Sequence, residues 1–354
     1  MTSPDTPFPE LIIGNKKISK DNFFSIAEIG HNHQGELKKA FQLISEAARC
    51  GVDAVKFQKR DNKSLFTKNF YDSPYDNPNS YGETYGKHRE YLEFGTSEYK
   101  ELIDYSNKLK VLLFATPFDL KSVEFLEKLN LPLYKIASAD LKNLPLQREI
   151  AKTNKPILLS TGGGTLEDVK RAKNNICEIN EKLAILQCTS SYPAETDNLN
   201  LKVIKTYMKE FKNHVIGFSD HENGIDAAIV AYILGARIFE KHFTLSRALK
   251  GTDHSFSLEP RGLERFIRNL KRIPKMMGSG VKEILSCEEK PILKMAKSIV
   301  AKILIEKGEI LSENNLTVKS PGSGLSPAVF YKILGKKINR SLGQDEEITE
   351  SDFE

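Results

Sequence analysis

The chain has 354 residues, of which 40% are hydrophobic, and a formal net charge of +5 at pH 7. Lys and Arg are scattered among Asp and Glu without a block of like charge, which argues against a nucleic-acid or membrane surface but leaves room for a local positive pocket. The longest apolar stretch, residues 227–239, is interrupted by Tyr232, Gly235 and Arg237 and is too short to span a bilayer.

The four cysteines are Cys50, Cys177, Cys188 and Cys287. They show neither the paired spacing of a metal site nor the framework of a disulfide-rich secreted domain. Residues 1–10 lack the basic and apolar pattern of a secretory leader. We therefore expect this chain in a reducing, cytoplasmic environment.

Eight short apolar runs follow one another along the chain, and each ends at a polar residue before a stretch with helical periodicity. The runs lie at residues 26–30, 54–58, 111–117, 133–138, 156–161, 183–189, 215–221 and 237–244. The helical stretches lie at residues 37–49, 99–109, 120–129, 145–152, 166–179, 201–211, 225–234 and 263–273. This alternation predicts an α/β fold, a (β/α)8 TIM barrel with its functional site at the carboxyl ends of the strands.

One segment within the barrel region lacks this rhythm. Residues 59–96, between the second strand and its helix, are polar and rich in Asn, Tyr and Asp. Loops of this length inside a compact domain are usually lids or binding loops. We therefore expect this segment to overhang the rim of the barrel.

The sequence changes character after the last barrel helix. We predict a barrel domain at residues 1–275 and a linker at 276–295, which contains a flexible Gly-Ser-Gly sequence. Short strands separated by Gly and Pro then predict a small β-rich domain at 296–354. The expected strands lie near residues 298–305, 316–318 and 347–349. Because a domain of this size would have a small hydrophobic core, we expect it to pack against a larger domain.

Two histidines lie at neighbouring positions of the predicted rim. His221 and His242 end the seventh and eighth strands, and adjacent strand ends in a barrel are roughly 5 Å apart. Two imidazoles at that distance can bind one divalent ion, although two histidines without a third ligand are also compatible with ordinary rim residues. Asp220 and Glu240 beside them offer a further ligand or a group that orients the histidines.

Two lysines stand inside apolar strands. Lys56 and Lys135 each need an anionic partner there, because an unpaired buried ammonium is costly. The partner is either a structural carboxylate such as Glu28 or Asp140, or a phosphate or carboxylate of a substrate. Nearby strand ends carry hydroxyl groups that favour the second interpretation. These hydroxyls belong to Thr116, Ser138, Ser160, Thr161 and Thr189.

Other features of the rim are ambiguous on their own. The glycines at 162–164 precede a predicted helix, whose amino end suits a phosphate, although a tight turn explains them equally well. Glu28 and Asp140 are candidates to carry a proton or orient a water molecule. A single acid at a strand end is more often the partner of a nearby lysine.

These motifs, taken in order, resemble the sialic acid (N-acetylneuraminate) synthase family. The matching segments read IAEIG at 26–30 with Asn32 and His33, VKFQ at 55–58, ATPF at 115–118, YKIAS at 134–138, LSTG at 159–162, Cys188-Thr189 with Tyr192-Pro193, GFSDH at 217–221 and EKHFT at 240–244. The tail, with KGE at 307–309 and PGSG at 321–324, resembles the C-terminal antifreeze-like (SAF) domain of that family. The resemblance covers nearly the whole chain.

The resemblance implies condensation of phosphoenolpyruvate with an open-chain N-acetylated hexose, which gives a nine-carbon 2-keto acid and phosphate. A divalent ion, Mn²⁺ or Mg²⁺, would be held by His221 and His242 and would act as a Lewis acid. Glu28 would position the attacking water. The resemblance assigns phosphoenolpyruvate binding to Lys56, Thr116, Lys135, Ser138 and Ser160, and sugar binding to Gln58, Tyr192 and Asp253. It also implies a homodimer in which the antifreeze-like domain of one chain caps the barrel of the other.

Three positions depart from the family pattern. Asp140 stands where a Glu is typical, and Ser190 replaces the Asn usually found two residues before the tyrosine. We keep Asp140 among the catalytic candidates and Ser190 among those for phosphoenolpyruvate. In the tail, Ser320 replaces an arginine that, in the family, reaches the acyl group of the sugar in the partner barrel. We keep Ser320 among the sugar-facing candidates, but it cannot make that charged contact.

Three functions are therefore compared. The first is the synthase, acting on N-acetylmannosamine or on a 2,4-diacetamido-trideoxyhexose. The second is another phosphoenolpyruvate or aldol-type lyase with a different aldehyde, and the third is a non-catalytic glycan-binding relative. The third predicts a disrupted site, yet both histidines, both lysines and Glu28 are present. The sequence thus favours the synthase.

Overall fold

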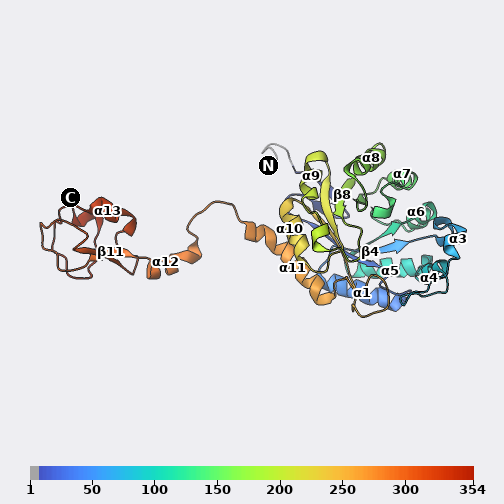
Figure 1. Cartoon of the computed structure of the whole chain (residues 1–354), viewed down its shortest axis with the longest axis horizontal. Coiled ribbons are helices and arrows are strands. Elements are labelled where there is room, and N and C mark those ends of the chain that lie inside the picture. Colours follow the sequence, from blue (N-terminus) through green and yellow to red (C-terminus); the bar gives the residue numbers. More distant parts are fainter. Residues whose placement is uncertain (1–7) are drawn as a thin grey trace. The chain divides into compact units, whose positions relative to one another are not determined.

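The structure is a computed structural model that describes residues 8–354, so most of the segment assessed for a leader lies outside the described residues. The chain divides into two compact units at Met277, and the second comprises Gly278–Glu354 (Figure 1). No helix among the described residues is long and apolar enough to cross a membrane.

The first unit is a closed barrel of eight parallel strands, as the alternation of strands and helices predicts. The strands are β3 (Phe24–Gly30), β4 (Ala54–Lys59), β5 (Leu112–Pro117), β6 (Tyr134–Ile136), β7 (Ile157–Ser160), β8 (Leu183–Cys188), β9 (Val215–Asp220) and β10 (Ile238–His242). They follow one another in chain order, and β10 pairs with β3 to close the ring. The main helices are α1 (Leu37–Cys50), α5 (Thr96–Lys108), α6 (Leu120–Glu127), α7 (Leu144–Lys152), α8 (Leu166–Cys177), α9 (Val203–Glu210), α10 (Asp226–Leu234) and α11 (Pro260–Met277).

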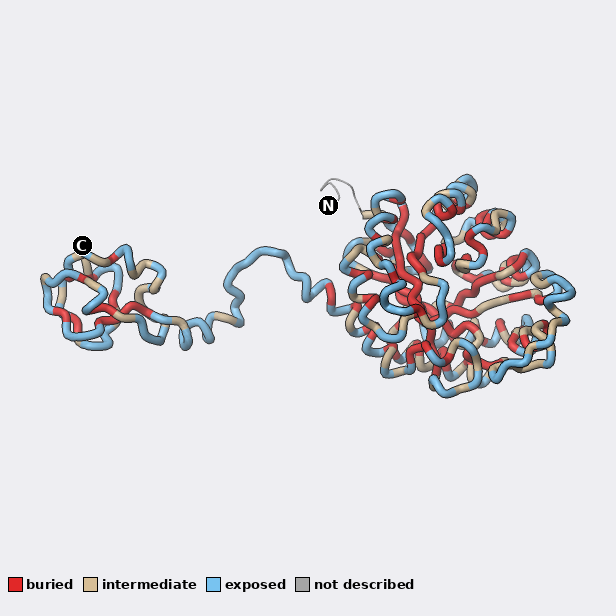
Figure 2. Tube along the Cα trace, in the orientation of Figure 1, coloured by how far each residue is buried: buried red, intermediate tan, exposed pale blue. Residues whose placement is uncertain are grey.

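The side chains inside the barrel change from apolar to polar between two successive inward-facing positions of the strands. Side chains two residues apart point to the same face of a strand. Near the amino ends, the interior positions form one buried apolar cluster that includes Ile26, Ala54, Phe114, Leu133, Leu158, Leu186 and Ile238. Two residues further along these strands lie Glu28, Lys56, Thr116, Lys135, Ser160, Cys188 and Glu240, all of which line a cavity. Figure 2 shows buried residues along the barrel strands, so both levels are shielded from bulk water.

A short hairpin that the sequence pattern did not indicate closes the amino end of the barrel. Its strands are β1 (Leu11–Ile13) and β2 (Lys16–Ile18), which pair in antiparallel fashion. Leu11, Ile13 and Ile18 are buried in the same cluster as the amino-terminal strand residues. Each strand has only three residues and begins or ends beside polar ones, which leaves too short an alternation to recognise in the sequence.

The segment between β4 and α5 is ordered and partly helical, where the sequence suggested only a loop. It contains α2 (Asn62–Leu65), α3 (Lys68–Tyr71) and α4 (Tyr85–Tyr91). Each helix begins at a polar cap, because the side chains of Asp61, Thr67 and Thr84 accept hydrogen bonds from backbone N–H groups of the first turn. We call residues 59–96 the rim insertion.

The second unit has its own small core. Strands β11 (Ser298–Ala301) and β12 (Leu316–Lys319) pair in antiparallel fashion. The buried core residues are Ile299, Ala301, Ile305, Leu311, Leu316, Ile333, Ile338, Leu342 and Ile348. Short helical segments complete it: η4 (Pro327–Val329), α13 (Phe330–Ile333) and η5 (Glu350–Asp352). The strand expected near 347–349 is a single bridge between Val300 and Glu347.

The segment expected as a linker contains more regular structure than its composition suggests. Helix α11 continues past Pro274 to Met277. Two further helical segments, η3 (Ser286–Glu288) and α12 (Glu289–Met295), precede β11. The N–H of Gly322 donates to the carbonyl oxygen of Leu293 at 2.9 Å, so α12 is bonded to the segment after β12 within the second unit.

The apolar level of the barrel should dominate its stability. Leu158 in β7 is fully buried, and Leu158→Ala is expected to lower the free energy of unfolding by about 2–5 kcal/mol. Leu120→Ala is the matched control, because Leu120 is 53% exposed. Chemical denaturation of both full-length variants measures the difference. Equal stabilities would contradict the assignment of this level as the core.

The rim insertion should make stability depend on pH through His88. Burial, with smaller effects of Arg89 and Lys250, lowers the pKa of His88 to about 4. In the unfolded chain this imidazole binds a proton near pH 6.5, whereas in the folded chain it stays neutral until about pH 4. The free energy of unfolding therefore falls as the pH decreases from about 6.5 toward 4, and the loss is about 2 kcal/mol at pH 5. His88→Gln should lose less unfolding free energy between pH 7 and pH 5 than the unmodified chain. Identical losses would show that this imidazole titrates normally.

Candidate functional site

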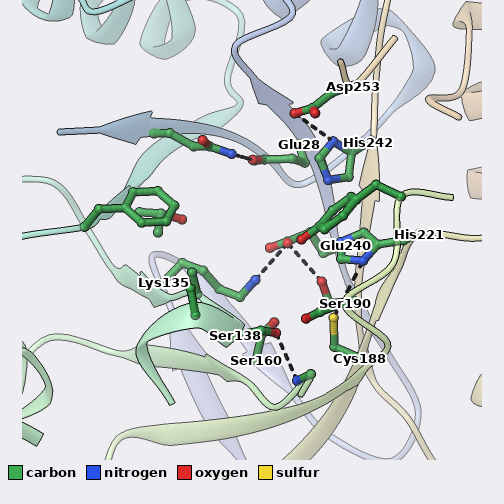
Figure 3. Close-up of a pocket in the computed structure, with 18 of the residues that line it drawn as sticks. Glu28, Lys135, Ser138, Ser160, Cys188, Ser190, His221, Glu240, His242 and Asp253 are labelled. Carbon is green, nitrogen blue, oxygen red and sulfur yellow. Dashed lines mark hydrogen bonds and ion pairs between the residues drawn. The ribbon is translucent and has the colours of Figure 1, made fainter. Parts of the chain in front are cut away.

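A cavity of about 840 Å³ lies at the carboxyl ends of the barrel strands. Most of the side chains selected from the sequence line it: Glu28, Lys56, Gln58, Thr116, Lys135, Ser138, Ser160, Ser190, Tyr192, His221, His242 and Asp253. Figure 3 shows His242 and Asp253 on one side of this cavity and Ser138 and Ser160 on the other. Residues that are up to 225 positions apart in the chain therefore meet in one place.

The floor of the cavity is a buried network of two lysines and two glutamates. Lys56 Nζ lies 2.9 Å from Glu28 Oε2 and 3.8 Å from Glu240 Oε1, and Lys135 Nζ lies 2.8 Å from Glu240 Oε1. Burial disfavours the charged form of Glu240, but the two lysines outweigh it and lower its pKa to about 2. In this structure both lysines pair with carboxylates, and the partner of Lys135 is Glu240 rather than Asp140. Two positive and two negative charges balance within the network.

Glu28 is held in a defined orientation. Its Oε1 accepts a hydrogen bond of 2.7 Å from Gln58 Nε2, and its Oε2 faces Lys56. The register places Glu28 beside Lys56 on β4 and beside His242 on β10. Burial raises the pKa of Glu28, against the effect of Lys56. A buried carboxylate of this kind can orient a water molecule or exchange a proton with it.

One side of the cavity presents hydrogen-bond donors. The N–H of Gly162 donates to Ser138 Oγ at 3.0 Å, and Ser160 Oγ is buried with no partner among the described residues. A Cβ atom at position 162 would lie 2.2 Å from Ser190 Oγ, so only glycine fits beside that hydroxyl. Because Ser138 Oγ accepts from that N–H, its own proton can be donated to an oxyanion, as can that of Ser160.

The amino end of α8 contributes less to this side than the sequence suggested. Thr165 caps the helix, and Asp168 Oδ2 accepts from the N–H of Thr165 at 3.0 Å. A side-chain carboxylate therefore already occupies the helix start. The groups on this side of the cavity that could donate to an anion are the hydroxyls of Ser138, Ser160 and Ser190.

The two histidines lie together at the rim. Their ring centroids are 5.3 Å apart, and the ring of Tyr192 lies 4.3 Å from that of His221. His221 Nδ1 is 2.8 Å from the carbonyl oxygen of Thr189, which leaves Nε2 as the nitrogen able to bind. His242 Nδ1 is buried without a hydrogen-bond partner and lies 3.9 Å from Asp253 Oδ2.

This pair fits a divalent ion. Burial lowers the pKa of His242 to about 3, which keeps that imidazole neutral, as metal ligation requires. Burial also disfavours the charged form of His221, but Cys188 outweighs it and raises the pKa of that imidazole. The hydrogen bond of His221 to a carbonyl oxygen is the usual way in which a ligating histidine is oriented. Asp253 supplies a carboxylate nearby. A separate group elsewhere, Cys177, Glu181 and His214, brings three ligand atoms within 4.8 Å of one another but does not line the cavity.

Five sequence candidates lie outside the cavity lining: Asp140, Thr161, Thr189, Asp220 and Ser320. The carboxylate of Asp140 accepts from Asn143 Nδ2 at 2.9 Å, because the short η1 helix (Ser138–Asp140) places it beside α7. Asp220 Oδ2 accepts from Lys241 Nζ at 2.7 Å and does not support the histidines. Ser320 belongs to the second unit, where its Oγ accepts from Lys297 Nζ at 2.6 Å.

The cavity also contains Glu240, which the sequence offered only as a neighbour of the histidines, and residues that were not selected from the sequence. Glu240 shares a strand face with His242, so both side chains point into the barrel. Cys188 Sγ lies 3.8 Å from His221 Nδ1. Asn79 and Arg89, with Arg60, reach the cavity from the rim insertion, where the sequence shows no period that would reveal their direction.

Comparisons with known proteins identify the family of this chain. The chain is 38% identical over 328 residues to N-acetylneuraminate-9-phosphate synthase of Homo sapiens, which covers 92% of this chain and 91% of that one. It is 40% identical over 329 residues to N,N'-diacetyllegionaminic acid synthase of Campylobacter jejuni, which covers 92% and 98%.

A solved structure and two family matches complete the comparison. The N-acetylneuraminic acid synthetase of Leptospira borgpetersenii, solved with citrate, superposes with a TM-score of 0.71 at 32% identity over 81% of this chain and 96% of that chain. Residues 43–282 match the NeuB family, and residues 296–354 match the SAF domain. The chain therefore belongs to the NeuB family and carries a C-terminal SAF domain.

Proposed function

We propose that this chain is a nonulosonic acid synthase that condenses phosphoenolpyruvate with an N-acetylated hexose in its open-chain form. A bond forms between C3 of phosphoenolpyruvate and the aldehyde carbon of the sugar. Water adds to C2, and the bond between C2 and the bridging phosphate oxygen then breaks. A nine-carbon 2-keto acid and inorganic phosphate leave, and the two protons of the water end on the former aldehyde oxygen and on the phosphate. The observation that carries this proposal is that donors for an oxyanion, a buried carboxylate and a histidine pair share one cavity.

The serine side of the cavity suits phosphoenolpyruvate. Ser138, Ser160 and Ser190, with the turn at 162–163, would hold its phosphate through hydrogen bonds. Lys56 donates to Thr116 Oγ1 at 2.9 Å, and this pair, with Lys135, would bind the carboxylate. Glu28, oriented by Gln58, would hold the water that adds to C2. We give Asp140 no role, because it lies outside the cavity lining.

The histidine side suits the sugar aldehyde. His221 and His242 would hold Mn²⁺ or Mg²⁺, which supplies Lewis-acid polarisation of a carbonyl oxygen when bound. The buried, unpartnered Nδ1 of His242 supports this assignment. Gln58, Tyr192 and Asp253 would contact the sugar. The orientation of both substrates before reaction would supply a large part of the rate enhancement.

We also propose that the enzyme acts as a homodimer in which the SAF domain of one chain covers the barrel mouth of its partner. Ser320 would then be the tail residue nearest the sugar, without the charge that the family pattern provides. The four free cysteines support a cytoplasmic location. A lyase acting on another aldehyde remains the alternative, and phosphate release with a series of acetamido sugars tells the two apart.

The histidine pair provides the first test. Chelator-treated protein is expected to release no phosphate from phosphoenolpyruvate and N-acetylmannosamine or a diacetamido-trideoxyhexose, and Mn²⁺ or Mg²⁺ should restore release. His221→Ala with His242→Ala should keep the circular dichroism spectrum and lose both turnover and Mn²⁺ binding. Full turnover of the metal-free protein, or of the double variant, would overturn the metal assignment.

The buried network provides a second test. Lys135→Met is expected to weaken phosphoenolpyruvate binding by about 1.5–3 kcal/mol, because it removes a charged donor. It should also destabilise the fold, since it leaves Glu240 with Lys56 alone at 3.8 Å.

A second substitution separates these two effects. Adding Glu240→Gln to Lys135→Met restores the charge balance and should recover stability but not phosphoenolpyruvate affinity, as measured by thermal unfolding and calorimetry. Recovery of both would show that Lys135 is structural only.

A further inference from the structure

Three side chains able to bind a metal gather at the end of the barrel opposite the cavity. Cys177 is the last residue of α8, Glu181 lies two residues before β8, and His214 immediately precedes β9. The register pairs Ala184 of β8 with Val215 of β9, so the amino ends of these strands lie side by side. The sulfur, a carboxylate oxygen and a ring nitrogen of the three side chains all lie within 4.8 Å of one another. The fold thus brings together one soft and two harder ligand atoms.

The imidazole of His214 has the orientation that a metal ligand needs. Its Nδ1 lies 3.3 Å from the carbonyl oxygen of Leu183, and its Nε2 lies 3.9 Å from the sulfur of Cys177. A carbonyl oxygen at one ring nitrogen fixes the tautomer in which the other nitrogen carries the lone pair. Burial, and to a smaller extent Lys173, lower the pKa of His214. The ring is therefore neutral at pH 7 and able to bind through Nε2.

The distance between sulfur and nitrogen suits a shared ion. In a tetrahedral zinc site, a Zn–S bond of about 2.3 Å and a Zn–N bond of about 2.0–2.1 Å place the two ligand atoms about 3.6 Å apart. The 3.9 Å between Cys177 Sγ and His214 Nε2 becomes such a distance with a shift of a few tenths of an ångström. Without an ion, the same contact is a weak hydrogen bond from the thiol to the ring nitrogen.

The loop that carries Glu181 is held in place by its own backbone and by Asn180. Asn180 is buried, its Nδ2 donates to the carbonyl oxygen of Lys155 at 2.8 Å, and its Oδ1 accepts from the N–H of Lys182 at 3.0 Å. The N–H of Leu183 donates to the carbonyl oxygen of Glu181 at 2.8 Å. The backbone on both sides of Glu181 is therefore fixed, whereas its side chain is exposed and can rotate toward an ion.

The charges at these residues suit a divalent ion once the thiol has lost its proton. Burial, and to a smaller extent Glu181, raise the pKa of Cys177 to about 11, so the thiol is protonated at pH 7 when no ion is bound. Lys173 acts in the opposite direction and assists the loss of that proton. A coordinating metal ion deprotonates the thiol, and the proton passes to solvent. The thiolate and the carboxylate then balance the two positive charges of the ion.

We propose that Cys177, Glu181 and His214 bind a thiophilic divalent cation such as Zn²⁺, with water in the fourth position. Thiolate and imidazole ligands favour zinc over magnesium, which prefers oxygen ligands. The bound ion joins the end of α8 to the starts of β8 and β9, and so stabilises the folded barrel. This site is separate from the histidine pair and does not depend on the proposed synthase function.

Cobalt binding tests the proposal, because a thiolate bound to Co²⁺ gives a charge-transfer absorption band in the near ultraviolet. The unmodified full-length protein should show this band, and Cys177→Ser should lose it. Glu181→Gln, an exposed substitution that should not disturb the fold, should weaken Co²⁺ binding by at least about 10-fold, the lower bound for groups that only support a ligand. Cys287→Ser is the matched control and should keep the band, because Cys287 is an exposed thiol of the second unit.

Cys188 requires a control of its own. Its sulfur lies 3.8 Å from His221 Nδ1, so an ion at the histidine pair could also give a thiolate band. A band that persists in Cys177→Ser and disappears in Cys188→Ser would place the thiolate at the histidine pair and overturn the proposal. The absence of a band in the unmodified protein, or unchanged Co²⁺ affinity in Glu181→Gln, would overturn it as well.

Thermal unfolding provides a second readout. Zn²⁺ at roughly 100 times its dissociation constant should raise the unfolding midpoint of the unmodified protein by about 5 °C more than that of Cys177→Ser. Mg²⁺ should affect the two proteins equally, because it does not bind the thiolate. An equal effect of Zn²⁺ on both would show that these residues hold no ion. Neither readout uses phosphoenolpyruvate or a sugar, so a failure of the synthase assignment leaves both informative.

Discussion

The chemistry of this protein depends on one change of polarity inside the barrel. In seven strands an apolar interior residue is followed, two positions later, by a polar residue that lines the cavity. The apolar level excludes water, so the charges directly above it must be paired. Glu28, Lys56, Lys135 and Glu240 satisfy each other there. Removing one member of such a network costs a large amount of stability, because it leaves a buried charge without a partner. The network therefore holds its side chains in fixed positions, and a site that orients two substrates needs fixed side chains.

Because that network is neutral, the groups that bind charged substrates must lie in other parts of the cavity. Because the lysine charges are matched by glutamates, the floor alone cannot provide a strong site for a highly charged substrate. The additional donors lie at opposite sides: serine hydroxyls and a glycine turn follow β6 to β8, and two arginines enter beside β4. The histidine pair is at the rim beside Tyr192. Phosphoenolpyruvate and a sugar can thus be held on different sides of the cavity while the carbons that react are brought together.

The barrel and most of its site were predictable because both follow from the period of the strands. Glu28, Lys56 and Lys135 stand at strand ends whose order fixes their neighbours. The partner of Lys135 was not predictable, since Glu240 lies on β10, across the barrel, and the choice between it and Asp140 depends on packing at η1. The hairpin at Leu11–Ile18 was not predictable for a different reason: its three-residue strands are too short to show an alternation of apolar and polar residues.

The rim insertion shows where sequence patterns stop being informative and specificity begins. Its helices are held by polar caps and by aromatic contacts, and not by an amphipathic pattern. For example, the ring centroid of Tyr85 lies 5.1 Å from that of Phe66 and 4.6 Å from that of Phe70. Arg89 lines the cavity, and Tyr85 and His31 contact its guanidinium. A barrel strand must keep its period to close the ring, whereas this segment is free to vary its side chains. The features that select the sugar are therefore expected in the part of the chain that the fold constrains least.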